Sequence, residues 1–192
     1  MPEQPSDSPA SPEDPRAEAE ESFLRWLGEL VVLVALAFIL AMGIKTFVVQ
    51  PFIIPSTSMV PTLEIDDRVL VNKFIYRFGS PSRGDVVVFT SPDNDGMDLI
   101  KRVIAVGGQT VELRDGTVFV DGSALKEPYV NPLIKDTYTS KQPTKVPPGY
   151  VWVMGDNRTN SRDSRYFGPQ PVANLLGKAF CIYWPIPRIR GL

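Results

Sequence analysis

Two serines, Ser56 and Ser58, lie in a short segment bounded by Pro55 and Pro61. Proline restricts its own backbone and that of the preceding residue, so this segment cannot join a helix. A rigid extended segment can hold one serine as a nucleophile and the other as a hydrogen-bond donor beside it. The alternative is a proline-rich linker without a catalytic role, which composition alone favours.

The sequence contains no histidine and only one cysteine, Cys181. Without imidazole, Ser-His-Asp and Cys-His catalytic sites are excluded. A structural zinc site and an intrachain disulfide are excluded as well, because both need residues that this chain lacks. The general base of a hydrolase would therefore be Lys, Asp, Glu, Tyr or a metal-bound water. Nothing in the sequence points to a metal site or a cofactor.

Lys101 and Arg102 are adjacent in the otherwise apolar run Leu99–Val106. Alternation along a strand sends the two cations to opposite faces, each between apolar neighbours. Burial disfavours the ammonium form and lowers the pKa of a lysine, as a lysine general base requires near neutral pH. The alternative is an edge strand that carries two solvated cations.

A polar segment, residues 155–165, follows the apolar run Tyr150–Met154. Its composition is that of an exposed loop. Paired charge-assisted hydrogen bonds could nevertheless fix it rigidly. The charged residues that could pair are Asp156, Asp163, Arg158 and Arg165.

Taken in order, these motifs resemble bacterial type I signal peptidase, in particular its cyanobacterial and thylakoid branch. They are an N-terminal apolar anchor, Pro-Ser-Thr-Ser-Met-Val-Pro-Thr-Leu, Lys-Arg-Val-Ile and Gly-Asp-Asn-Arg-x-Asn-Ser-x-Asp-Ser-Arg. The resemblance covers roughly Val32 to Trp184, and the last motif is the most specific. It implies a Ser-Lys endopeptidase that forms an acyl-enzyme and removes signal peptides from exported preproteins.

The resemblance also implies roles for individual residues. Ser58 matches the nucleophile and Lys101 the general base. Ser56 matches the hydroxyl that forms the oxyanion hole together with the backbone N–H of Ser58. Ser161 matches the serine that hydrogen-bonds and orients the lysine. The residues that match the supporting loop are Asp156, Asp163 and Arg165.

The chain departs from the family pattern at two places. Thr57 stands where the family often has glycine, and we expect its side chain to point away from the site. Gly107-Gly108-Gln109 stands where the family usually has Pro-Gly-Asp or Pro-Gly-Glu. The second departure affects a local turn rather than the chemistry.

Three segments are expected along the chain. Residues 1–22 are rich in Pro and Glu and carry a net charge of −6, so we expect a disordered tail. Residues 23–50 contain the apolar run Leu30–Ile44 and, with its flanks, match the roughly 20 residues of a membrane span. The acidic N-terminal flank and the bulky residues after Lys45 favour an uncleaved anchor over a cleaved signal peptide.

Residues 51–192 are expected to form a mainly β, antiparallel catalytic domain. Seven Val-, Ile-, Phe- and Tyr-rich runs are separated by Gly, Pro, Asn and Asp, which favour turns. Asp115-Gly116 predicts a two-residue hairpin turn. Asn131–Pro148 is polar and proline-bearing and is expected to be a surface excursion. The seven predicted strands are Arg68–Lys73, Asp85–Thr90, Leu99–Val106, Thr110–Arg114, Thr117–Asp121, Tyr150–Gly155 and Ala179–Trp184.

The expected partners are preproteins with signal peptides and the lipid bilayer. Beyond the tail the net charge is +4 and is spread along the chain, so nucleic acid is not indicated. The resemblance implies a single-pass protein of the plasma or inner membrane, or of the thylakoid membrane, with its catalytic domain on the extracytoplasmic side.

Two alternative functions remain. One is a self-cleaving Ser-Lys repressor-type protease, which the anchor argues against. The other is a non-enzymatic anchored β module.

Overall fold

The structure is a computed structural model that describes residues 15–93, 96–131 and 140–192. The chain forms two compact units, Met1–Ile44 and Lys45–Leu192. The first unit contains most of one long helix, and the second contains all of the β-strands. The order of elements confirms a mainly antiparallel β fold with one long N-terminal helix.

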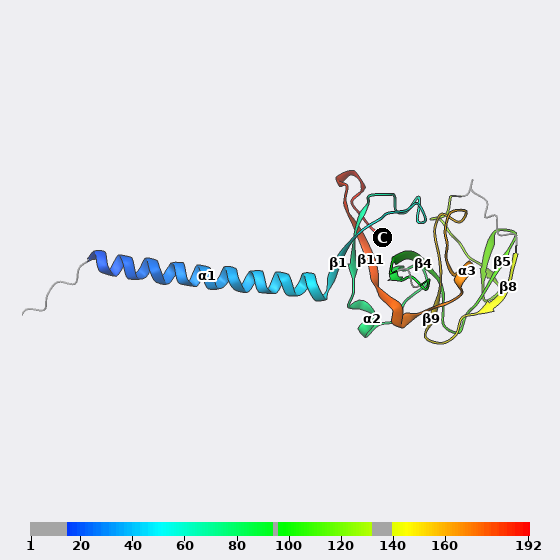
Figure 1. Ribbon diagram of the computed structural model, residues 1–192, viewed down its shortest axis with the longest axis horizontal. Coiled ribbons are helices and arrows are strands. Elements are labelled where there is room, and N and C mark those ends of the chain that lie inside the picture. The colour runs from blue at the N-terminus through cyan, green and yellow to red at the C-terminus, as the bar shows by residue number, and fades with distance from the viewer. Residues whose placement is uncertain (1–14, 94–95, 132–139) are drawn as a thin grey trace, which may run out of the picture. The chain divides into compact units, whose positions relative to one another are not determined.

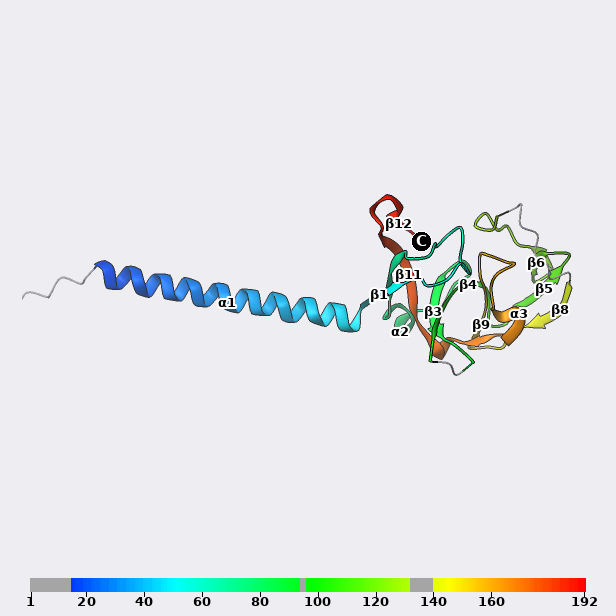
Figure 2. The same ribbon diagram turned by 45° about the horizontal axis from the view of Figure 1, so that its top comes forward.

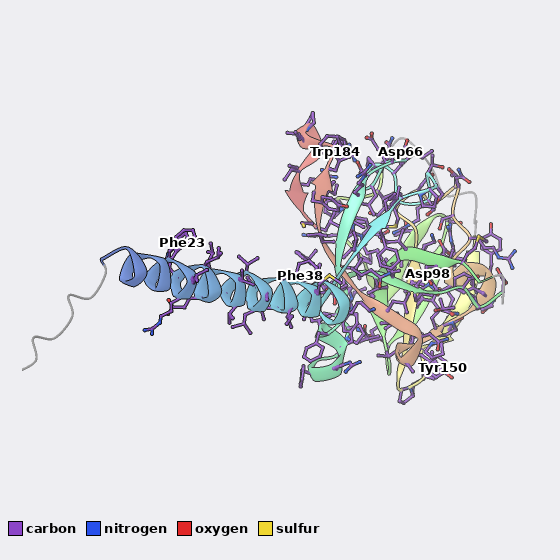
Figure 3. All side chains as sticks on the ribbon, turned by 60° about the vertical axis from the view of Figure 1, so that its left-hand side comes forward. Phe23, Phe38, Asp66, Asp98, Tyr150 and Trp184 are labelled. Atoms are coloured by element: carbon purple, nitrogen blue, oxygen red, sulfur yellow. The ribbon has the colours of Figure 1, made fainter. Side chains whose placement is uncertain are left out.

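Helix α1 spans Pro15–Phe47 and is drawn as one uninterrupted helix in Figure 1. Its stretch Phe23–Gly43 is long and apolar enough to cross a membrane. At 1.5 Å per residue this stretch measures about 32 Å, close to the hydrocarbon thickness of a bilayer. Figure 3 shows Phe23 and Phe38 projecting from the helix, with 57% and 65% of their surface exposed.

Both ends of α1 differ from the predicted segment boundaries. The helix begins at Pro15, inside the segment predicted to be disordered, while residues 1–14 lie outside the described part of the chain. Proline is well suited to the first helical position, and the Ala- and Glu-rich sequence after it favours helix. At the other end, the predicted anchor overlaps strand β1, Val49–Ile53, because the chain leaves the helix at Phe47.

The large sheet of the second unit has the order β1-β2-β11-β3-β4-β9-β10, and β12 pairs with β11. All of its pairs are antiparallel. Figures 1 and 2 show β1 at one end of this unit and the small sheet at the other. The strands beyond β1 are β2 (Arg68–Asn72), β3 (Val86–Thr90), β4 (Asp98–Val106), β9 (Tyr150–Met154), β10 (Gln170–Pro171), β11 (Leu175–Trp184) and β12 (Arg190–Gly191).

The small sheet has the order β7-β6-β5-β8. Its hairpin between β5 and β6 turns at Asp115 and Gly116, whose φ angles are 47° and 77°. Positive φ at both positions is what a type I′ turn requires, so the predicted hairpin is confirmed. The strands are β5 (Thr110–Arg114), β6 (Thr117–Val120), β7 (Ser123–Ala124) and β8 (Ser140–Lys145).

Strand β8 corrects one prediction, because it lies within the segment Asn131–Pro148 that was expected to be a surface excursion. The strand lies at the edge of the small sheet, where polar side chains can face water. Pro143 falls at a register irregularity opposite β5, a position where the missing N–H of proline is tolerated. Residues 132–139 of the same segment lie outside the described part.

The cores of the second unit lie on the faces of the two sheets, in three clusters of buried apolar side chains. One cluster packs Met59 and Leu63, from the connection between β1 and β2, against β2, β3 and β11. This packing fixes the segment that carries Ser58. The remaining helices are short: α2 (Ile75–Phe78), α3 (Ser164–Phe167), η1 (Val172–Asn174) and η2 (Ile186–Arg188).

Candidate active site

Three parts of the chain meet at the candidate active site. Ser58 lies in the connection between β1 and β2, Lys101 lies on β4, and the loop that follows β9 starts at Gly155. The Nζ atom of Lys101 donates a hydrogen bond of 2.8 Å to the Oγ atom of Ser58. Ser58 and Lys101 are 8% and 3% exposed. The two residues predicted as nucleophile and base therefore lie in direct, buried contact.

Burial disfavours the charged form of the Lys101 side chain. It lowers the pKa of this lysine to about 8, although the carboxylates of Asp163 and Asp156 act in the opposite direction. The ammonium also donates 2.8 Å to the carbonyl oxygen of Ile100. Arg102 is buried as well. The alternative of an edge strand with two solvated cations is thus wrong.

Ser56 lies beside the nucleophile and is exposed. Its Oγ donates to Ser58 Oγ at 3.4 Å, which is long for an O–H···O hydrogen bond. Within the described part of the chain, the backbone N–H of Ser58 donates to no acceptor. Both donors required for the predicted oxyanion hole are therefore near Ser58 Oγ.

Gly155 directly follows β9, at the position that would face Lys101 if the register of Arg102 with Met154 continued. A Cβ atom built there would lie 2.3 Å from Ser161 Oγ and 2.4 Å from the carbonyl oxygen of Ser58. Only glycine allows this approach, since real Cβ atoms do not come so close to other atoms. The absent side chain brings the loop and the nucleophile segment together.

Ser161 lies in the site, but its predicted contact with Lys101 is absent. Its Oγ is buried and has no hydrogen-bond partner among the described residues. The hydrogen bonds of the Lys101 ammonium go instead to Ser58 and Ile100. The orienting role of Ser161 therefore remains a prediction, and this structure lacks the hydrogen bond that it requires.

Asp156 is fully buried and holds the loop against β4. It accepts hydrogen bonds from Arg102 Nε at 2.9 Å and Nη2 at 2.7 Å. Thr62 Oγ1, from the nucleophile segment, donates to the same carboxylate at 2.5 Å. Sequence reasoning did not assign a role to Thr62 or Arg102, although both lie inside the motifs that it singled out.

Asp163 and Arg165 form a second buried pair within the loop. Arg165 donates through Nε and Nη2 to the two carboxylate oxygens, each at 2.8 Å. Asp163 also accepts from the backbone N–H of Gly155 at 2.9 Å. This bidentate geometry is the rigid loop support that the charges predicted.

The loop binds the nucleophile segment through two asparagines. Asn157 donates from its backbone N–H to the Ser58 carbonyl at 3.1 Å and from its side chain to the Thr57 carbonyl at 3.1 Å. Asn160 donates to Thr57 Oγ1 at 2.8 Å. The side chain of Thr57, expected to point away from the site, thus bonds to the loop, because the asparagines supply donors at this spacing.

The comparisons with known proteins agree on one family. The family model described as "Signal peptidase, peptidase S26" matches residues 27–184. The chain is 40% identical over 237 residues to "Signal peptidase I" of Mycobacterium tuberculosis (strain CDC 1551 / Oshkosh), covering 95% of this chain and 80% of that protein. It is 44% identical over 169 residues to "Probable signal peptidase I-2" of Synechocystis sp. (strain ATCC 27184 / PCC 6803 / Kazusa), covering 85% and 76%.

A plant relative is similar over a shorter stretch. The chain is 38% identical over 157 residues to "Thylakoidal processing peptidase 1, chloroplastic" of Arabidopsis thaliana, covering 76% of this chain and 45% of that protein. The family match and the extent of the bacterial matches lead to one conclusion. The chain belongs to the signal peptidase family, peptidase S26, and is a peptidase of the signal peptidase I type.

Proposed function

We propose that this peptidase is a membrane-anchored serine endopeptidase that removes N-terminal signal peptides from exported preproteins, with Ser58 as nucleophile and Lys101 as general base. The observation that carries the proposal is the 2.8 Å hydrogen bond between Lys101 Nζ and Ser58 Oγ in a buried site. The bacterial relatives that carry the name signal peptidase I support the choice of substrate.

The proposed reaction follows from this geometry. Neutral Lys101 takes the proton of Ser58 as its Oγ attacks the carbonyl carbon of the scissile peptide bond. The resulting ammonium gives that proton to the leaving amine, and an ester between Ser58 and the signal peptide forms. Lys101 then removes a proton from water, which attacks the ester. The bond between the acyl carbon and Ser58 Oγ breaks, Lys101 returns the proton to this oxygen, and the signal peptide is released with a free carboxylate.

The oxyanion that develops on the carbonyl requires donors that are in place before the reaction. The N–H of Ser58 and the hydroxyl of Ser56 are the proposed donors, and their positions beside Ser58 Oγ support this role. Loss of one such donor typically lowers the rate by about 10²–10³. Ser56→Ala should therefore retain a weak activity that Ser58→Ala lacks.

An unpaired strand edge supports the binding of an extended substrate. Strand β9 pairs with β4 only from Arg102 onward. The edge of Asp98–Lys101 on that side has no strand partner among the described residues. A substrate that added a strand there would place its backbone beside Lys101. Arg102 and Val103 already pair with β9, so the unpaired edge ends at Lys101.

The anchor and the location belong to the same proposal. The apolar stretch Phe23–Gly43 of α1 supports a single uncleaved span, with the catalytic domain after it. The catalytic domain would lie on the extracytoplasmic side of the plasma or inner membrane, or of a thylakoid membrane. The proposed partners are the lipid bilayer and preproteins, without nucleic acid.

Cleavage of a purified preprotein by the detergent-solubilised full chain tests the function. Ser58→Ala and Lys101→Ala should each abolish processing, whereas exposed Lys126→Ala should process normally. Unchanged processing by either active-site variant would contradict the Ser-Lys mechanism. Absence of processing by wild type would instead contradict the proposed preprotein substrates.

A further inference from the structure

The segment Glu127–Tyr129 follows the small sheet in the chain and contacts the active-site loop through its side chains. It follows β7, and its neighbour Leu125 donates a backbone hydrogen bond of 2.9 Å to Val118 of β6. Leu125 and Tyr129 also pack against the cluster of buried side chains shared by β4, β5, β6 and β9. The segment is thus fixed to the body of the β unit.

Glu127 binds Arg158 of the active-site loop through both of its carboxylate oxygens. Arg158 Nη1 donates to Oε2 at 2.7 Å, and Nη2 donates to Oε1. The side chains of Arg158 and Glu127 are only 2% and 12% exposed. A buried bidentate pair is directional and is only weakly screened by solvent. Glu127 therefore fixes both the position and the orientation of the Arg158 guanidinium.

Tyr129 joins this pair to the second arginine of the site. Its hydroxyl donates to Glu127 Oε1 at 3.0 Å. Its ring lies against the Arg102 guanidinium, whose central carbon is 4.1 Å from the ring centroid. Arg102 in turn holds Asp156. Glu127 and Tyr129 thus contact both cations that bind the start of the active-site loop.

The Arg158 guanidinium also contacts the part of the loop that packs against Ser58. Arg158 Nε donates to the carbonyl oxygen of Gly155 at 3.2 Å. Gly155 is the position where Ser161 Oγ and the Ser58 carbonyl leave no room for a Cβ atom. A shift of the Gly155–Asp156 peptide would therefore change the packing beside the nucleophile and let water reach the buried Lys101.

We propose that Glu127 and Tyr129 are positioning residues for peptide cleavage, acting through Arg158 and Arg102 to hold the Gly155–Asp156 peptide against the Ser58 segment. The inference rests on the proposed function of Ser58 and Lys101. Neither residue touches the reacting atoms. Their effect should appear in kcat rather than in KM, because the open edge of β4 is left intact.

Steady-state cleavage of a preprotein by the full chain in detergent, measured across pH, tests this role. In Glu127→Gln we expect kcat to fall by roughly 10- to 100-fold, the scale of loss that follows small misplacements of reacting groups. KM should stay within about twofold of wild type if this edge is intact. The acidic limb of the profile should move up by about half a pH unit or more, because water entering around Lys101 reduces the desolvation that lowers its pKa.

Two further variants control for misfolding. Leu125→Ala shortens an apolar side chain that precedes this segment and contacts neither arginine, so it should lower thermal stability while leaving the pH profile unchanged. Tyr129→Phe removes only the hydroxyl that meets Glu127. It should fold even if Glu127→Gln does not, with a smaller loss of kcat and a shift of the acidic limb in the same direction.

Several outcomes would overturn the inference. A wild-type kcat in both Glu127→Gln and Tyr129→Phe would contradict a positioning role. A loss of activity of equal size at every pH would also contradict it, because such a loss indicates fewer folded molecules. Glu127→Gln combined with Arg158→Gln should lose no more activity than Arg158→Gln alone, whereas multiplicative losses would contradict action through Arg158. Processing that survives Ser58→Ala would contradict the proposed function instead.

Discussion

Lys101 Nζ and Ser58 Oγ lie 2.8 Å apart although the residues are 43 positions apart in the sequence. The contact forms because β4 is central in the large sheet and the segment after β1 packs its apolar residues onto the same sheet. A lysine at such a position loses its hydration. This loss of hydration lowers the pKa of Lys101 and makes its charged form unfavourable in the folded protein.

The first prediction is that Lys101→Met is more stable than wild type at neutral pH. The pKa of Lys101 is about 8 in the folded protein against 10.5 for an ordinary lysine, so the unfolded chain binds more protons between these values. Wild-type stability therefore rises with pH across this window. Below about pH 8 the difference from Lys101→Met should be on the order of 3 kcal/mol.

Urea unfolding of both proteins across pH checks this prediction. The advantage of Lys101→Met should shrink steadily from about pH 8 and be small near pH 10.5. The exposed Lys126→Met serves as a control and should show no such trend. An advantage of Lys101→Met that stays constant with pH would mean that burial does not lower the pKa of this lysine.

The second prediction concerns Gly155. Gly155→Ala places a Cβ atom where Ser161 Oγ lies 2.3 Å away and the Ser58 carbonyl 2.4 Å away. The loop must shift, so we expect kcat to fall by roughly 100-fold or more. In the control Gly191→Ala the nearest atom lies 3.9 Å from the new Cβ, and preprotein cleavage should be unchanged. Normal kcat in Gly155→Ala would show that this close approach is dispensable.

The third prediction compares two ion pairs of the same loop. Asp163→Ala removes the carboxylate from a pair whose side chains are 0% and 1% exposed. Loss of one partner from a buried pair typically destabilises by about 3–5 kcal/mol. Arg162→Ala breaks an exposed pair with Asp93 and should change the free energy of unfolding by less than about 1 kcal/mol. Denaturant unfolding should therefore separate the two variants clearly, and equal effects would contradict the buried support.

Local sequence signals predicted much of the fold. Six of the seven predicted strands agree with the structure to within one residue at each end, because apolar alternation and Gly or Asp turns mark them locally. The seventh, Ala179–Trp184, is the end of the longer β11, whose first residues include Gly177 and lack a clear pattern. Five strands were missed: β1 continues an apolar anchor, β8 is polar with a proline, and β7, β10 and β12 are only two residues long.

The sequence predicted some residues of the candidate site but not others. Ser58, Lys101, Asp156 and Asp163 lie in motifs that can be recognised in the chain, and the structure brings all four together. Glu127 and Tyr129 could not be found in this way. Their contacts with Arg158 and Arg102 depend on how the small sheet packs against β4 and β9, and no local pattern encodes that packing.

The pH dependence of preprotein cleavage tests the central claim, a lysine base for Ser58, most directly. Because only neutral Lys101 can accept the proton, kcat/KM for the full chain should rise about tenfold per pH unit below the pKa. The midpoint should lie near pH 8, where burial places the pKa of Lys101. Activity should then level off at higher pH. A flat profile between about pH 6 and 10 would contradict a lysine base.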